Sequence, residues 1–190
     1  GFTIKLLAVA QARQESGLLA RVHPALIPVD VPMASVNGAL NAVEVEGDLV
    51  GPLWFQGPGA GPEPTASAVM GDILRIAKGA VVNGIHSAGR KPFEIAPMSD
   101  HVCQYYIRLT ASDRPGVLAN VAKVLGDADI SINSVLQKDT DVESGQADLV
   151  IMTPPARESN IQNAVSNIRE LDTVLHLDSL IRVEAYAERS

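Results

Sequence analysis

The sequence predicts an α+β protein of two folded units joined by a connector. Residues 101–190 carry strand-like and helix-like periodicities in the order strand, helix, strand, strand, helix, strand. Residues 1–80 carry several strand-like runs, then a glycine-rich loop and one helix. Between the two, residues 81–100 lose both periodicities, as is typical of a linker, and are punctuated by Gly84, Gly89, Pro92 and Pro97.

The first half of the second unit is predicted to be a strand, a helix and a strand. Residues 104–110 and 130–136 alternate between apolar and polar side chains and are rich in β-formers. Between them, apolar residues recur at helical spacing over 117–125. We expect Asp113 to cap this helix and Pro115 to lie in its first turn.

The second half repeats this logic after a polar turn at 139–145. Residues 146–152 are predicted to form a strand, and the proline pair at 154–155 stops it. A helix follows, marked by Ile161, Val165 and Ile168, and a strand at 174–183 closes the unit. Two right-handed crossovers then give a four-stranded antiparallel sheet with both helices on one face. This is the ferredoxin-like βαββαβ topology, which by itself implies no function.

The first unit is less regular. We expect a buried strand over 4–9 and a second extended stretch over 18–29 that Pro24 interrupts. Turn residues at 37–38 and 46–48 separate further strands at 43–46 and 49–56. A helix is expected from about Thr65 to Gly79, with an apolar face made of Val69, Ile73, Ile76 and Ala77.

Composition narrows the function classes. The 15 Lys and Arg against 22 Asp and Glu give a net charge of −7, and no basic stripe is present, so a nucleic-acid partner is not expected. No apolar run is long enough to span a membrane, and the start lacks the features of a signal peptide. We therefore expect a cytoplasmic protein, and we interpret the chain as part of a longer one.

Few residues stand out as candidates for chemistry. Cys103 lies in an alternating strand, which favours a small buried side chain over a reactive thiol. His23 is interpreted as a hydrogen-bonded structural residue rather than as a general base. The remaining histidines show no metal-ligand spacing with Cys, Asp or Glu, so no metal is expected.

The loop formed by Gly57, Pro58, Gly59, Ala60 and Gly61 lies between a strand and a helix. Such loops bring backbone N–H groups close to anions or cofactors. The spacing differs from the dinucleotide fingerprint, and Pro58 and Pro62 remove N–H donors. From the residues alone, nucleotide contact and a tight packing turn both stay open.

The second unit resembles ACT domains. The stretch Asp113-Arg114-Pro115-Gly116-Val117-Leu118-Ala119 is similar to the family's loop, and Ile132-Asn133-Ser134 is similar to its next strand. The resemblance implies an amino-acid effector that is bound by Asp113, Gly116, Val117 and Asn133, between domains that pair edge to edge in a homodimer or tetramer. A helix N-terminus favours the effector's carboxylate. A structural appendage that only dimerises is the alternative.

The first unit resembles the C-terminal part of the homoserine dehydrogenase catalytic and dimerisation region. The resemblance rests on ordered motifs, which are Ile4-Lys5-Leu6-Leu7-Ala8, Arg21-Val22-His23-Pro24, Val36-Asn37-Gly38, Asn41-Ala42-Val43, Gly57–Gly61 and Pro64–Asp72. A carboxy-terminal ACT domain is typical of bacterial members of that family.

This resemblance implies NAD(P)-dependent interconversion of L-aspartate 4-semialdehyde and L-homoserine, with threonine as the expected feedback effector. It implies that Gly57, Gly59, Ala60 and Gly61 lie beside the nicotinamide end of the cofactor. It also places the family's catalytic lysine, substrate carboxylates and Rossmann half before Gly1. We therefore expect no catalytic residue in this chain, Lys5 included, and no complete cofactor site. A non-enzymatic amino-acid-binding regulator or oligomerisation module is the alternative.

Overall fold

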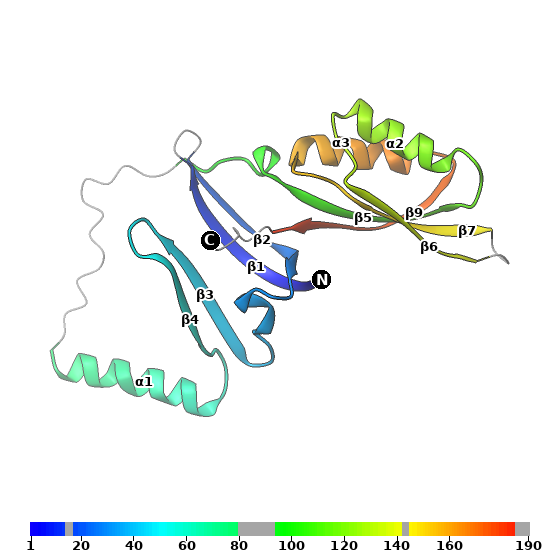
Figure 1. Ribbon diagram of the computed structural model, residues 1–190. Coiled ribbons are helices and arrows are strands. Elements are labelled where there is room, and N and C mark those ends of the chain that lie inside the picture. Colours follow the sequence, from blue (N-terminus) through cyan, green and yellow to red (C-terminus); the bar gives the residue numbers. More distant parts are fainter. Residues whose placement is uncertain (14–16, 80–93, 142–144, 185–190) are drawn as a thin grey trace. The chain divides into compact units, whose positions relative to one another are not determined.

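The computed structural model describes residues 1–13, 17–79, 94–141 and 145–184 (Figure 1). They form two compact units, one of Gly1–Pro28 with Phe93–Ser190 and the other of Val29–Pro92. The first two strands therefore pack with the C-terminal module, whereas the sequence division assigns 1–80 to one domain. Most of the predicted linker, residues 80–93, lies outside the described residues. No helix among the described residues is long and apolar enough to cross a membrane.

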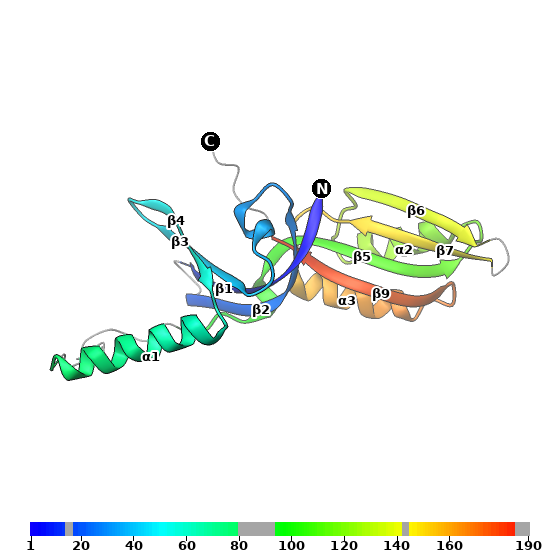
Figure 2. The same ribbon diagram turned by 90° about the horizontal axis from the view of Figure 1, so that it is seen from below.

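The predicted βαββαβ order of the C-terminal module is confirmed. Its strands are hydrogen-bonded in the order β9-β5-β7-β6, all antiparallel. Both helices lie on one face of this sheet (Figures 1 and 2). The elements are β5 (Val102–Ser112), α2 (Val117–Asp127), β6 (Ser134–Asp141), β7 (Gln146–Met152), α3 (Glu158–Arg169) and β9 (Val174–Val183).

The core of this module lies between the sheet and the two helices. Every second residue of β5 points into it, and Tyr105, Ile107, Leu109 and Ala111 are fully buried. The helices contribute their predicted apolar faces, including Val121 and Leu125 from α2 and Ile161, Val165 and Ile168 from α3. Burying apolar area of this kind is the main favourable contribution to folding.

Four local predictions for this module are wrong, one of them the place of Pro115, which precedes the N-cap of α2 and so lies outside its first turn. Strand β6 begins at Ser134 and not at residue 130, because the Ile130 N–H donates to the Leu125 carbonyl and its side chain turns into the core. The same strand continues to Asp141, into the predicted polar turn. Gly116, with φ of 94°, is the N-cap of α2, and no side chain caps this helix. Asp113 instead uses its backbone N–H, which donates to the Gly145 carbonyl.

The first two strands form a long hairpin that joins the same sheet. Strand β1 (Phe2–Arg13) pairs antiparallel with β2 (Gly17–Pro28), and β2 pairs in parallel with β9 at two positions, Ala25↔Arg182 and Leu26↔Val183. The strand prediction for 4–9 is confirmed but its burial is wrong, since Leu6 is 73% exposed. β1 pairs only with β2 among the described strands, so it is an edge strand.

Pro24 does not interrupt β2, contrary to the prediction. The register with β1 continues through Pro24↔Leu6 without a shift. The parallel pairing of β2 with β9 covers only the two residues after Pro24, so β2 is close to a free edge along most of its other side. Proline is tolerated at such a position because its missing N–H removes no ladder hydrogen bond there.

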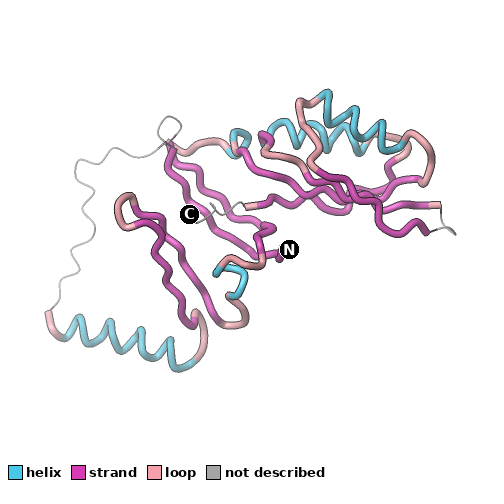
Figure 3. The backbone as a smooth tube through the Cα atoms, viewed as in Figure 1, coloured by secondary structure: helices cyan, strands magenta, loops and turns pink. Residues whose placement is uncertain are grey.

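The other compact unit contains the predicted hairpin and helix (Figure 3). After a short 3-10 turn, η1 (Pro32–Ser35), the strands β3 (Leu40–Gly47) and β4 (Gly51–Pro58) pair antiparallel, and the helix α1 follows (Pro62–Ala77). Helix α1 begins earlier than expected because prolines are favoured in a first helical turn. None of the described residues from 29 to 79 is buried, so this unit holds no core of its own among them.

Candidate functional site

The glycine-rich loop connects β4 to α1, as predicted, and two of its glycines have a steric role. A Cβ on Gly59 would lie 1.4 Å from Asn41 Nδ2, so any other residue there would displace the Asn41 amide. The Gly59 N–H donates to the Ala39 carbonyl at 2.9 Å. Gly61 is the N-cap of α1 with φ of 128°, a conformation that other residues rarely adopt.

The start of α1 is a poor cradle for phosphate. Pro62 and Pro64 have no N–H, and the Thr65 N–H and hydroxyl both donate to the Gly61 carbonyl. Glu63 adds a negative charge in the first turn. The loop therefore suits close approach of an uncharged, flat group better than binding of a pyrophosphate. The open space around Gly57, where a Cβ would meet no atom within 4 Å, fits such an approach.

The predicted effector loop follows β5. Gly116 holds the left-handed conformation that ends the loop, and an added Cβ there would meet no atom within 4 Å. Asp113 is exposed, whereas the Val117 side chain is 5% exposed and belongs to the core. Val117 can therefore offer a ligand only its backbone. In this first turn the Val117 N–H donates to the Arg114 carbonyl at 3.4 Å and the Asn120 N–H donates to the Gly116 carbonyl at 3.0 Å. The N–H groups of Leu118 and Ala119 come before the first i−4 acceptors of the helix.

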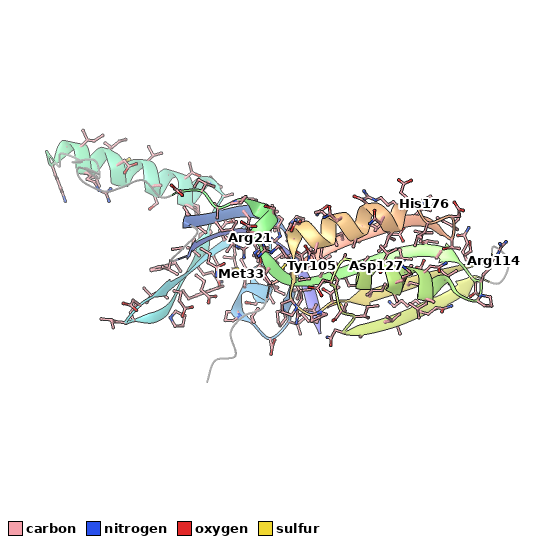
Figure 4. All side chains as sticks on the ribbon, turned by 90° about the horizontal axis from the view of Figure 1, so that it is seen from above. Arg21, Met33, Tyr105, Arg114, Asp127 and His176 are labelled. Carbon is pink, nitrogen blue, oxygen red and sulfur yellow. The ribbon has the colours of Figure 1, made fainter. Side chains whose placement is uncertain are left out.

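The fourth predicted effector residue, Asn133, lies at the other end of the module. Its N–H donates to the carbonyl of Met152, at the last position of β7, whereas the loop follows Ser112, which pairs with Gln146 at the first. The 7 residues of β7 separate the two ends by about 20 Å. In Figure 4 the labelled Tyr105 and Arg114 lie toward opposite ends of this module. A single chain therefore does not bring Asn133 to the loop.

Strand β6, which follows Asn133, is an edge strand. Among the described strands it pairs only with β7. Its Val135 and Leu136 are 37% and 54% exposed. An unpaired strand edge is a template for antiparallel pairing with a second copy. A two-fold pairing along β6 would place the beginning of one β6 beside the end of the other, which is the end that carries the loop.

A buried polar cluster, which sequence reasoning missed, occupies the Asn133 end of the module. Glu158, 4% exposed at the start of α3, accepts hydrogen bonds from Tyr105 Oη at 2.8 Å, Gln162 Nε2 at 2.8 Å and Arg182 Nε at 2.7 Å. Glutamate in a first helical turn, together with an arginine on the closing strand, was the available signal. The pairing of Glu158 with Arg182 and Tyr105 could not be predicted, because these residues are far apart in the sequence.

The cluster shifts the pKa of its members. Burial would raise the pKa of Glu158, but the hydrogen bonds from Arg182, Gln162 and Tyr105 outweigh it, so the pKa lies below its ordinary value. The hydrogen bond to Glu158 raises the pKa of Arg182. Burial raises the pKa of Tyr105 and that of the neighbouring Cys103, the latter to about 11. Cys103 is thus a buried, protonated thiol, as the sequence predicts.

His23 is also buried and hydrogen-bonded, as predicted. Its Nδ1 lies 3.1 Å from the Pro24 carbonyl oxygen, and its Nε2 lies 3.5 Å from Glu184 Oε1. Glu184 in turn accepts three hydrogen bonds from Arg21. Over the described parts of the chain, no group of three or more His, Cys, Asp or Glu side chains could hold a metal ion.

Comparison with known proteins matches both parts of the chain to families. Residues 1–74 match the homoserine dehydrogenase family and residues 105–173 match the ACT domain. A homoserine dehydrogenase of Pseudomonas aeruginosa is 39% identical over 97% of this chain. The chain joins the C-terminal part of a homoserine dehydrogenase catalytic region to an ACT domain. The glycine loop belongs to the first of these parts and the Gly116 loop to the second.

Further relatives agree over nearly the whole chain. A homoserine dehydrogenase of Corynebacterium glutamicum is 38% identical over 97% of it. The crystal structure of a homoserine dehydrogenase from Thiobacillus denitrificans is 39% identical over 97% of the chain, with a TM-score of 0.83. The chain spans less than half the length of these relatives, namely 44%, 42% and 43% of them.

We expect the Glu158 cluster to make the stability of the ACT domain pH-dependent. Glu158→Gln leaves the Arg182 charge uncompensated and should cost about 1–3 kcal/mol near pH 7. Because the folded-state pKa is lowered, this contribution is fully present above the unfolded-state value of about 4.3 and is lost as pH falls through the folded-state pKa. Urea denaturation between about pH 7 and about pH 3 should therefore show the two proteins converging on acidification.

The control for this measurement is Glu170→Gln, which removes an exposed carboxylate at the end of the same helix. It should change the free energy of unfolding by less than about 0.5 kcal/mol at any pH. A constant difference between wild type and Glu158→Gln down to the acid limit would contradict the assignment.

Proposed function

We propose that this chain is the C-terminal part of a homoserine dehydrogenase that interconverts L-aspartate 4-semialdehyde and L-homoserine with NAD(P), and that its ACT domain binds threonine as a feedback effector. The observation that carries the proposal is the ordered match of residues 1–74 and 105–173 to the two families in one chain. Relatives 38% and 39% identical over 97% of the chain bear the name of that enzyme.

The contribution of this chain to the reaction is structural positioning. The cofactor supplies and accepts the hydride when it is bound. The backbone of Gly57, Gly59, Ala60 and Gly61 would lie against its nicotinamide end, where the absence of side chains permits close approach. The proline-rich start of α1 supports contact with an uncharged ring rather than with the phosphates. The charge-bearing parts of the cofactor would then be held elsewhere in the enzyme.

We propose that the effector site is shared between two copies of the ACT domain. The Gly116 loop and the first turn of α2 offer N–H groups to the carboxylate of an amino acid. Asn133 lies about 20 Å away in the same chain, but an antiparallel pairing of two β6 edges would bring it to the partner's loop. Its amide oxygen can accept from the ammonium group or the hydroxyl of threonine. The proposal therefore includes a homodimer or a higher oligomer.

The test of the enzymatic part compares two polypeptides. The 190-residue chain alone should show no NAD(P)⁺-dependent oxidation of homoserine, because the resemblance assigns the catalytic lysine and the Rossmann half to preceding sequence. The same chain extended by the sequence that precedes it in its gene should be active, as followed by NAD(P)H absorbance. Turnover by the 190-residue chain would refute the first statement. An inactive extended chain that still binds threonine would favour the non-enzymatic regulator.

The test of the effector site uses isothermal titration with threonine. Wild type should give saturable heat of binding. Gly116→Asp should abolish this heat, because the new carboxylate repels the carboxylate of the effector. Aspartate is among the residues that can adopt the positive φ of this position. The matched control Gly116→Asn has nearly the same shape without the charge and should keep most of the affinity. Asn133→Ala should weaken binding at least about tenfold. Asn163→Ala, on the exposed side of α3, should not.

No heat with wild-type protein would remove threonine as the effector. Equal affinity in Asn133→Ala and wild type would remove Asn133 from the site.

A further inference from the structure

Strand β9 ends on two charged residues of opposite sign. Arg182 and Glu184 are two residues apart on an extended chain, so their side chains leave it on the same side. Arg182 binds Glu158 within the ACT domain, and Glu184 binds Arg21 of β2. The end of β9 is therefore tied by one ion pair to Glu158, inside the ACT match, and by another to Arg21, inside the homoserine dehydrogenase match.

The Arg182–Glu158 pair is connected to Asn133 through hydrogen bonds and neighbouring strand residues. Tyr105 Oη donates to Glu158, and the Tyr105 N–H donates to Thr153 Oγ1 at 3.1 Å. Thr153, which is fully buried, donates its own N–H to the Tyr105 carbonyl. Its neighbour Met152 accepts the hydrogen bond from the Asn133 N–H at 2.8 Å. Buried groups connected in this way have little freedom to move independently.

The outer pair is the main polar link between β9 and the hairpin. Arg21 donates to Glu184 through Nε at 3.0 Å and through Nη2 at 2.9 Å to each oxygen, and the two side chains are only 5% and 15% exposed. The backbone link beside it is short. It consists of two paired positions and the Glu184 N–H, which donates to the Leu26 carbonyl at 3.0 Å.

Because so few contacts join β9 to the hairpin, a small displacement of Glu184 should have a large effect on the position of β2. Separating the two partners of a buried ion pair leaves an uncompensated charge, which is costly. The pair therefore favours the single register of β2 and β9 in which it can form. A displacement of Arg182 moves Glu184 with it, because only Val183 separates them. Changes at the Asn133 end of the ACT domain can thus reach a segment of the homoserine dehydrogenase match, residues 1–74.

We propose that the Arg21–Glu184 ion pair is the joint through which the ACT domain sets the position of the β1–β2 hairpin. The pair acts as a positioning element for the hairpin. As a route for feedback it rests on the proposed function, since it connects the Asn133 half of the effector site to the catalytic region. As a mechanical connection it stands on the described contacts alone.

The first arm of the test needs no effector. Tyr105→Phe removes one hydrogen bond to Glu158 but keeps the buried ring. Hydrogen exchange of the 190-residue chain should then be at least about fivefold faster at the Glu184 amide and along β2. Lys123→Met, which removes an exposed ion pair on α2, is the control and should leave these amides unchanged.

The decisive comparison places Tyr105→Phe in a background that lacks the joint. Arg21→Met with Glu184→Leu replaces the ion pair by apolar side chains, a change that folded proteins often accept. In that background Tyr105→Phe should alter exchange along β2 by less than about twofold, because coupled sites are non-additive. The charge swap Arg21→Glu with Glu184→Arg should restore the response.

The second arm adds threonine. Threonine should change exchange along β2 in wild type by at least about fivefold and should do so by less than about twofold without the joint. If titration of wild type with threonine gives no heat, threonine is not the effector. The role of the Arg21–Glu184 pair is then tested by the Tyr105→Phe comparison alone. A Tyr105→Phe effect that is absent from β2, or equally large without the ion pair, overturns the joint even if threonine binds.

Discussion

The central position of β5 determines where the features of the ACT domain lie. This strand is paired on one side with β7 and on the other with β9, and four of its inward side chains, from Tyr105 to Ala111, are fully buried. Its 11 residues also separate the two ends of the ACT domain. The loop with Gly116 begins where β5 ends. The Glu158 cluster and the connection to the hairpin gather where β5 begins. Because β5 is extended and paired on both sides, the features at its two ends stay apart within one chain.

That separation explains why a ligand site in this domain would need a second chain. The edge strand β6 runs parallel to β5, so the residue before β6 and the loop after β5 face opposite ends. Only an antiparallel partner strand reverses this relation. Under the proposed function, effector binding would therefore require an oligomer. The loop would supply N–H groups, and the partner would supply Asn133.

Periodicity predicted most elements, because strands and helices of this module each bury one face. The ends of β7 and β9 coincide with the predicted ranges of 146–152 and 174–183. Periodicity failed where an alternating segment is not paired, as at Ile130, and where a capping side chain was expected in place of Gly116. It also could not reveal pairings such as Arg21 with Glu184, which are 163 residues apart. Such contacts depend on how the whole sheet is assembled.

The compact unit of residues 29–92 carries the other half of the proposed function. It presents exposed apolar side chains on the hairpin and on α1, among them Leu49, Phe55 and Ile76. Because none of its described residues, 29–79, is buried, this part of the chain gains little from the hydrophobic effect by itself. We propose that other parts of the complete enzyme cover these side chains, and that the glycine loop thereby reaches the cofactor.

The shared effector site is tested most directly by mixing two chains that each bind threonine weakly or not at all. Gly116→Asp and Asn133→Ala chains, unfolded together and refolded, should form mixed dimers in which one site combines an intact loop with an intact Asn133. Threonine titration should then recover binding of wild-type affinity at about a quarter of the wild-type sites. If mass spectrometry demonstrates mixed dimers but threonine binding is not recovered, the site is not shared between two copies.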